Sequence, residues 1–304
     1  MKNRKKIMST LTTVCAVLGI VAAHPFHASA VIGGSVPSTD SVANAVAKIG
    51  PGALNCSGVM ISPSWALTAR HCVDDINILG DIDTITPITP GIHRNEGNYM
   101  GEVYRAPSGD LALININGVH KGTIAQLPTQ EYPLGTAAQS VGFGGGGVNI
   151  RTAESVNMIL TDIYSVRSGK FHHGVGRSHY LLFDYDSAET GRIHKGDSGG
   201  PIFIGDEVVG IMSHGTINKN DGSFDDESGA DVFASLEWIL DTTGITVTDT
   251  AEDNNDNSDN DDVDSKEGPA SNTSLVLTDN GPSRIGSNTS SALIGLSSEA
   301  LFSS

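Results

Sequence analysis

Short apolar runs separated by glycine and proline dominate the chain between residues 31 and 244. Few segments there have the apolar spacing of about three to four residues that an amphipathic helix needs. Many short β-type runs with Gly and Pro turns are typical of an all-β barrel or sandwich, and no alternation of strands with helices predicts a parallel sheet. We expect one closing helix at 235–240, with Gly244 as its stop. The expected strands are 42–49, 57–61, 65–69, 111–115, 138–143, 155–161, 180–185, 201–204 and 207–213.

Residues 1–30 have the pattern of a secretory signal peptide. They begin with basic side chains, continue through a largely apolar stretch and end in the small residues Ala-Ser-Ala. This order predicts a signal peptide rather than a membrane span, and therefore a secreted, extracellular protein without a transmembrane segment. Cleavage after Ala30 exposes Val31 directly, whereas cleavage after Ala23 leaves a short pro-segment, 24–30.

The end of the chain differs in composition from the region before it. Residues 249–264 are almost entirely Asp, Asn, Ser and Glu, which cannot bury enough apolar surface to fold alone. We therefore expect 247–304 to be an acidic Asp/Asn-rich linker followed by a Ser-rich tail, both disordered. The apolar clusters of the tail are too short to span a bilayer. We hypothesise that the tail holds the protein near the cell envelope.

The charge balance narrows the range of partners. The chain has 18 Lys and Arg against 35 Asp and Glu, a formal net charge of −17. Four of the basic residues lie in 1–30, so the secreted form has 14 basic residues and a net charge of −21. Such a chain is poorly suited to bind nucleic acid or an anionic membrane surface.

A glycine-rich loop at 196–201, Gly-Asp-Ser-Gly-Gly-Pro, carries the candidate chemistry. Glycines leave room for a substrate carbonyl and let backbone N–H groups point at the oxygen that becomes negative. Serine is inert at neutral pH, so Ser198 as a nucleophile requires a base and a group that orients the base. The segment 68–72, Thr-Ala-Arg-His-Cys, supplies His71, and Asp110 precedes an apolar run that predicts a buried strand.

The order His, Asp, Ser with these flanking motifs, and with Val-Ile-Gly-Gly at 31–34, resembles the trypsin and chymotrypsin family of serine peptidases. The resemblance runs from about residue 31 to about residue 244. It implies a peptidase domain at 31–246, built from two packed six-stranded antiparallel β-barrels with a C-terminal helix and a crossing near 126–137. It also implies a serine endopeptidase that acts on proteins or peptides in the cleft between the barrels, with no cofactor.

The resemblance also assigns roles to the matched residues. His71 is the general base and then the general acid, Asp110 orients its ring, and Ser198 attacks the substrate carbonyl. The backbone N–H groups of Gly196 and Ser198 form the oxyanion hole.

Two further contacts follow from the same resemblance. The new N-terminal ammonium of Val31 pairs with Asp197 and shapes the oxyanion hole. Family members usually cover this terminus with a propeptide that ends in a basic residue; because Ala30 stands here instead, we hypothesise that secretion itself activates the enzyme. Cys56 and Cys72 form a disulfide, as expected for an even pair in an exported protein. A zinc pair is the alternative, but no second pair of ligands has suitable spacing, so no metal is expected.

The substrate pocket allows several interpretations. The resemblance places Arg192 at the pocket floor and, through the Val-Phe pair that follows, Asp231 at a second floor position. If the two pair, small or apolar side chains are favoured; if Arg192 points outward, Asp231 receives Arg or Lys; if Arg192 is free and Asp231 lies elsewhere, acidic side chains are favoured. We favour Arg or Lys narrowly. Ser213, His214 and Gly215 resemble the strand that pairs with the substrate backbone.

Two other classes of function fit the sequence less well. A binding protein that keeps the peptidase fold without turnover, acting through its surface or its acidic tail, has no physical need for an intact triad and Gly196. An esterase or lipase places its serine in a Gly-x-Ser-x-Gly elbow before the acid and the histidine, and the order here differs. His172, His173 and His179 have no triad context, and we expect them to be surface or loop residues.

Overall fold

The computed structural model describes residues 31–50, 56–74, 86–145, 152–169, 172–249 and 275–278. The predicted signal peptide at 1–30 and most of the predicted tail lie outside these residues. Within the tail, the strand β14 (Leu275–Thr278) pairs with β13 (Thr246–Asp249), a two-stranded sheet that the expectation of a disordered tail did not include. No helix in the described part of the chain is long and apolar enough to cross a membrane.

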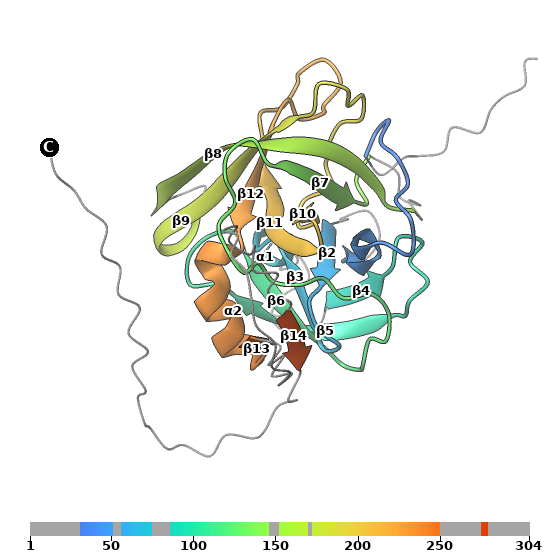
Figure 1. The fold of residues 1–304 in the computed structure, drawn as a ribbon, viewed down its shortest axis with the longest axis vertical. Coiled ribbons are helices and arrows are strands. Elements are labelled where there is room, and N and C mark those ends of the chain that lie inside the picture. The colour runs from blue at the N-terminus through green and yellow to red at the C-terminus, as the bar shows by residue number, and fades with distance from the viewer. Residues whose placement is uncertain are drawn as a thin grey trace, which may run out of the picture.

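Two closed antiparallel barrels of six strands each make up the body of the protein (Figure 1). This confirms the predicted fold class. The first barrel runs in the order β1-β2-β3-β6-β5-β4 and the second in the order β10-β11-β12-β9-β8-β7. The first barrel consists of β1 (Val46–Ile49), β2 (Cys56–Met60), β3 (Trp65–Thr68), β4 (Thr86–Pro90), β5 (Tyr99–Arg105) and β6 (Ala112–Ile116). The second consists of β7 (Ala137–Gly142), β8 (Glu154–Gly169), β9 (His172–Tyr185), β10 (Pro201–Ile204), β11 (Glu207–His214) and β12 (Glu227–Asp231).

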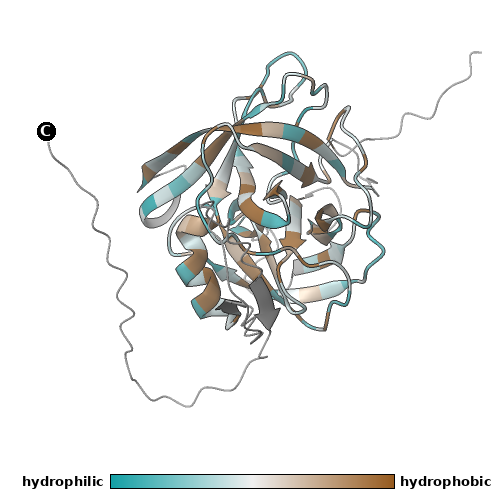
Figure 2. Ribbon diagram, in the orientation of Figure 1, coloured by the Kyte–Doolittle hydropathy of each residue, from teal (hydrophilic) through white to brown (hydrophobic). Residues whose placement is uncertain are grey.

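Each barrel has its own apolar interior, and a third cluster lies between the barrels. Hydrophobic residues recur along the strands of both barrels (Figure 2). The inter-barrel cluster joins residues such as Leu67 and Leu113 of the first barrel to Phe143 and Ile211 of the second. A strand with one face toward the interior of its barrel and the other toward this cluster is buried on both faces. In β3, for example, all four residues are buried. Such strands therefore appear in the sequence as unbroken apolar runs.

The helices are short and lie at the ends of the barrels. The helix α2 (Leu236–Thr243) ends at Gly244, whose φ of 70° is the left-handed conformation that glycine adopts at low cost. Both the closing helix and its glycine stop were predicted. The run 42–49, expected as a single strand, instead begins with a 3₁₀ turn, η1 (Val42–Ala45), in which the Asn44 amide donates to Glu96 and accepts the N–H of Ile92.

Strands β8 and β9 form a hairpin much longer than the sequence predicted. They have 16 and 14 residues, against the shorter runs expected at 155–161 and 180–185. Their pairing continues outward from Leu160 and Phe183 to Gly169 and His172. The outer half was missed because its exposed positions are polar and charged. This hairpin also places His172, His173 and His179 on a strand rather than in a loop, with His179 exposed.

The chain passes from one barrel to the other between Ile116 and Ala137. Within this connection Gln126 forms an isolated bridge with Glu207 of β11. The Glu207 carboxylate accepts hydrogen bonds from the hydroxyls of Thr129 at 2.9 Å and Tyr132 at 2.7 Å. The connection is thus tied to the second barrel before β7 begins.

A disulfide joins Cys56 of β2 to Cys72 in α1 (His71–Asp74), with a sequence separation of 16. The predicted pairing is therefore confirmed. The bond holds the short helix that carries His71 against the first barrel.

Replacement of both cysteines by alanine should lower the free energy of unfolding by about 3 kcal/mol, because a closed loop of this length restricts the unfolded chain by that amount. Urea unfolding of the Ser198→Ala protein, with and without the cysteines, measures the change. Chemical reduction of the parent protein should give a loss of similar size. Equal unfolding midpoints for all three samples would show that the bond does not stabilise the fold.

Candidate active site

The pairing of β3 with β6 brings His71 and Asp110 together. In this antiparallel pair Thr68 lies opposite Ala112, so the residues just after β3 and just before β6 are neighbours. The Asp110 carboxylate accepts the backbone N–H of His71 at 2.8 Å and contacts the ring Nδ1 at 2.7 Å. With two oxygens bound to the same residue, the carboxylate fixes both the position and the orientation of the imidazole.

The second barrel supplies a third donor to this carboxylate. The hydroxyl of Ser213, at the end of β11, donates to Asp110 at 2.6 Å. Burial by itself would raise the pKa of Asp110, but the hydrogen bonds and positive charge of His71, together with the Ser213 hydroxyl, hold that pKa below its ordinary value. Asp110 is therefore an ionised, buried acceptor at which donors from both barrels meet.

The loop that carries Ser198 leaves two amides unused. Within the loop, the N–H groups of Asp197, Gly199 and Gly200 donate to backbone carbonyls. Those of Gly196 and Ser198 donate to no described residue. Gly196 has a φ of 103°, which a side chain would disfavour. Two free amides in one tight loop match what an oxyanion hole requires.

The first barrel holds this loop in place. The N–H of Ser57, on β2, donates to the Ser198 carbonyl at 2.8 Å, and its hydroxyl donates to the Gly196 carbonyl at 3.0 Å. The Cys72 sulfur lies 3.5 Å from the same Ser198 carbonyl oxygen and 3.7 Å from His71 Nε2. The nucleophile loop and the histidine therefore pack against one disulfide.

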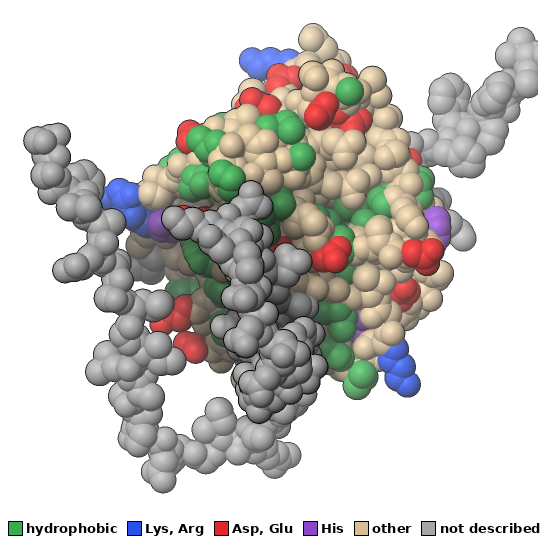
Figure 3. Space-filling model, viewed as in Figure 1, with side chains coloured by type: hydrophobic (Ala, Val, Ile, Leu, Met, Phe, Trp, Pro, Cys, Tyr) green, Lys and Arg blue, Asp and Glu red, His purple; other side chains and the backbone are tan. Residues whose placement is uncertain are grey.

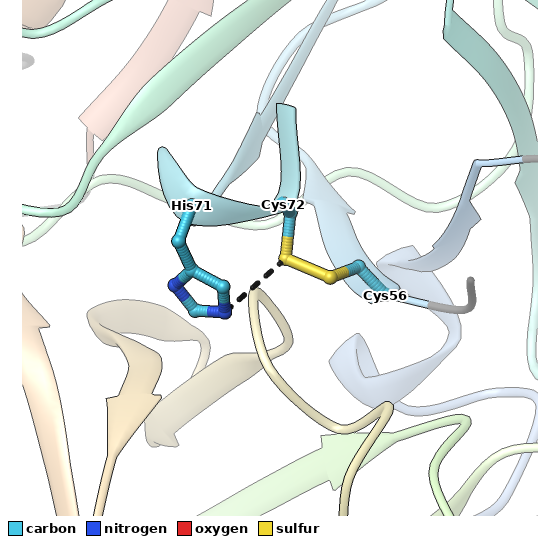
Figure 4. A group of neighbouring side chains, drawn as sticks. All are labelled: Cys56, His71 and Cys72. Atoms are coloured by element: carbon cyan, nitrogen blue, oxygen red, sulfur yellow. Dashed lines mark hydrogen bonds between the residues drawn. A yellow bond between two sulfur atoms is a disulfide. The ribbon is translucent and has the colours of Figure 1, made fainter. Parts of the chain in front are cut away.

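The Ser198 hydroxyl makes no hydrogen bond to a described residue, so its contact with His71 stays a prediction. Catalytic hydrogen bonds are often long in enzymes without substrate and shorten when it binds. Figure 4 shows the His71 ring beside the disulfide, with Nε2 turned toward Cys72. Cys56, His71 and Cys72 are close enough to suggest a metal site, but the two sulfurs are bonded to each other and so are not free thiolates.

Asp197 is completely buried beside the nucleophile. Its carboxylate accepts the N–H groups of Gly144 at 2.6 Å and His194 at 2.8 Å. A Cβ at Gly144 would lie 2.4 Å from this carboxylate, so only glycine allows the contact. Burial raises the pKa of Asp197 to about 7, and these two hydrogen bonds do not offset it. Val31 is also fully buried, in the apolar cluster that includes Ile193.

The structure does not bring Arg192 and Asp231 together. The Arg192 guanidinium donates to the carbonyls of Glu189 and Gly191 and lies 4.4 Å from the centre of the Tyr185 ring. Asp231 accepts the N–H of Ala234 at the other end of the second barrel. Of the alternatives given for the pocket, the one in which Arg192 pairs with Asp231 is therefore not found.

The sequence analysis did not assign Glu227 to the pocket. It lies four residues before Asp231 on the same strand, a distance of about 13 Å along an extended chain. Its carboxylate is buried and accepts the N–H of Ser213 at 2.9 Å. Burial, with the nearby charges of Asp197, Asp226 and Asp110, raises the pKa of Glu227 well above its ordinary value.

The rest of the predicted pocket surrounds Glu227. Ser213 and His214 end β11, and Gly215 follows them so closely packed that a Cβ would lie 2.2 Å from the Asp226 carbonyl oxygen. On the other side, the Tyr185 hydroxyl accepts the N–H of Ile193 and donates to the Phe224 carbonyl. These contacts join the segments on either side of β12 into one wall.

The chain is similar to several known proteins. The family model described as Trypsin matches residues 31–239. An uncharacterized peptidase of Corynebacterium glutamicum (strain R) is 28% identical over 243 residues, covering 78% of this chain and 81% of that protein. Serine protease SP24D of Anopheles gambiae is 26% identical over 241 residues, covering 74% and 85%. The crystal structure of the Rv3671c protease of M. tuberculosis in an inactive form aligns with a TM-score of 0.48 at 16% identity, covering 67% of this chain and 90% of that one.

The raised pKa of Asp197 predicts how stability depends on pH while residues still precede Val31. The folded chain then holds this proton to about pH 7, and the unfolded chain releases it near pH 4, so stability falls as pH rises between these values. The whole loss is roughly 4 kcal/mol, about 1.36 kcal/mol for each unit of the pKa difference.

Urea unfolding of a Ser198→Ala protein that starts at His24 tests this expectation at pH 4.5 and pH 7, with the same protein carrying Asp197→Asn as control. The parent should lose more stability than the control between the two pH values. The same pH dependence in both proteins would contradict the expectation.

Proposed function

The chain belongs to the trypsin family of serine peptidases, and from this premise we propose that it is a secreted endopeptidase that cleaves peptide bonds through an acyl-enzyme. The observation that carries the proposal is the pair of contacts between Asp110 and His71, at 2.7 and 2.8 Å. They leave Nε2 of the ring as the nitrogen that can accept a proton. The unused amides of Gly196 and Ser198 support the same chemistry.

In the proposed reaction His71 Nε2 removes the hydroxyl proton as Ser198 Oγ bonds to the substrate carbonyl carbon. The carbonyl oxygen becomes negative and accepts hydrogen bonds from the amides of Gly196 and Ser198, each worth roughly 3 to 4 kcal/mol in the transition state. His71 then protonates the leaving amine, and the peptide bond breaks to give an ester on Ser198. Water, deprotonated by His71, attacks that ester, and the proton returns to Ser198 as the acid product leaves.

We propose that cleavage after Ala30 completes the site. The free Val31 ammonium would supply the positive charge that the buried Asp197 carboxylate lacks, and an opposite charge lowers the pKa of a carboxyl group. The burial of both residues and the backbone bridge between Ile32 and Arg192 support a terminus held in this region. Because the residue directly before Val31 is Ala30 rather than a basic residue, removal of the signal peptide would be the activating step.

The acidic surface is consistent with action on proteins or peptides rather than on polyanions. On the face shown in Figure 3, carboxylates occur in many places and Lys and Arg in a few separate groups. We propose that the tail holds the protein near the cell envelope; most of that segment lies outside the described residues. Release of the protein into the medium after deletion of 247–304 would test it, and unchanged release would argue against an anchoring role.

For the cleaved bond we propose a preference for Arg or Lys, with Glu227 in the role first assigned to Asp231. Glu227 forms no ion pair with a described residue, and the Arg192 guanidinium is held by backbone carbonyls and by Tyr185. A buried carboxylate with a raised pKa binds a cation with release of its proton. A cationic substrate side chain would therefore supply the missing charge.

A fluorophosphonate probe should label the secreted protein, because it traps a serine that an adjacent base activates. Ser198→Ala should abolish labelling, and Ser187→Ala, at an exposed turn, should leave it unchanged. The labelling rate should fall in acid as the His71 ring becomes protonated. A secreted wild-type protein that starts at Val31 and takes no label would instead favour the binding protein without turnover.

Glu227→Gln should lower kcat/KM for substrates with Arg or Lys before the cleaved bond by about 100-fold, since removal of one partner from a buried charge pair costs roughly 2 to 5 kcal/mol. Asp231→Asn is the matched control and should change kcat/KM for these substrates little. Profiling of both variants with a peptide library measures the two effects together. If acidic side chains were preferred by the wild type, Arg192 rather than Glu227 would set the specificity.

A further inference from the structure

A chain of hydrogen-bonding side chains extends from Asp110 away from His71. The Ser213 hydroxyl, which donates to Asp110 at 2.6 Å, lies 3.2 Å from Nδ1 of His214. Nε2 of the same ring lies 3.2 Å from the Tyr164 hydroxyl, which lies 3.0 Å from the Ser228 hydroxyl. We propose that His214 is a positioning residue that acts through Ser213 on Asp110 and lowers the pH at which the peptidase loses its activity. This inference rests on the proposed function.

The direction of each bond follows from counting hydrogens. A serine hydroxyl has one hydrogen, and an ionised carboxylate can only accept. The Ser213 hydrogen therefore goes to Asp110, and Ser213 Oγ has only lone pairs left for His214. Nδ1 of His214 must accordingly carry a hydrogen and donate it to Ser213. This assignment comes from the network rather than from observed hydrogens.

Tyr164 lets His214 satisfy this requirement in both of its protonation states. In the neutral ring Nε2 has no hydrogen, and it accepts the Tyr164 O–H. In the imidazolium Nε2 donates to the Tyr164 oxygen, and the Tyr164 hydrogen turns to the Ser228 hydroxyl. Nδ1 donates to Ser213 in both cases, so the chain toward Asp110 keeps its direction.

The two tyrosines beside His214 keep their protons at neutral pH. The Tyr180 ring packs edge-on against His214 with centroids 5.0 Å apart, and burial raises the pKa of Tyr180 to about 12. Burial also raises the pKa of Tyr164. The charged and titratable groups facing the chain from the neighbouring elements are Asp110 and His71 of the first barrel, Asp162 on β8, and Asp226 and Glu227 at the start of β12.

His214 should lower the pH at which His71 becomes protonated. A donor to Ser213 Oγ strengthens the hydrogen bond that Ser213 gives to Asp110, because successive hydrogen bonds polarise one another. Asp110 then has less electron density to stabilise a protonated His71. A positive charge on His214 acts in the same direction. His71 therefore stays neutral, and able to accept the Ser198 proton, to lower pH than it would without His214.

The test is the acid limb of kcat/KM against pH for the secreted protein, measured with one peptide substrate. His214→Phe removes both nitrogens and should move the midpoint upward by about half a pH unit. His214→Asn is the matched variant, since its amide can place an N–H near the position of Nδ1 without titrating. It should recover most of the wild-type midpoint. Tyr164→Phe should move the midpoint in the same direction as His214→Phe, by less.

His214 also borders the strand expected to bind the substrate backbone, so its replacement can change the size of kcat/KM for that reason alone. The pH midpoint of the acid limb is therefore the quantity that tests the proposal. A His214→Phe midpoint equal to that of the wild type would overturn the proposal, and so would an Asn variant displaced as far as the Phe variant. Fluorophosphonate labelling of Ser198 in each variant distinguishes a failure of the His214 proposal from a failure of the proposed peptidase function. Labelled variants with unshifted midpoints contradict the role of His214 alone, whereas an unlabelled wild type contradicts the proposed peptidase function itself.

Discussion

A single buried carboxylate, that of Asp110, depends on both barrels at once. The first barrel supplies two donors from His71, and the second supplies the Ser213 hydroxyl. An ionised carboxylate is stable in the interior only while such donors surround it. Separation of the barrels would therefore leave this charge without its third donor and would also open the site. The packing of the barrels and the orientation of His71 are in this sense one constraint.

The other buried carboxylates in the same region are less well satisfied. Asp197 has two amide donors and Glu227 has one, and burial raises the pKa of each. Each lies where the proposed function brings a cation: a processed N-terminus near Asp197 and a cationic substrate side chain near Glu227. Neither acid has a cationic partner among the described residues, and each would gain one only after processing or substrate binding. The acidic composition of the chain fits this arrangement.

The β8–β9 hairpin also contacts the residues around Asp110. Its inward-facing residues Tyr164, Ser178 and Tyr180 approach the site from the second barrel, and Ser178 accepts the N–H of Gly109, the residue before Asp110. The hairpin thus contacts the loop that carries the carboxylate as well as the ring of His214. Its polar outer half gave no strand signal, and its importance could be seen only from its contacts.

The sequence by itself determined the all-β class, the closing helix with its glycine stop, and the Cys56–Cys72 pair, because each depends on local spacing or on a motif that one segment carries. It also selected His71, Asp110 and Ser198 as candidates, and the structure joins the first two. Only the tertiary structure decided which acid reaches Ser213, because strand pairing places Glu227 beside that residue and Asp231 opposite Gly210. The chain from Asp110 to Tyr164 likewise exists only in the fold, since residues 110, 164, 213 and 228 become neighbours when the barrels close.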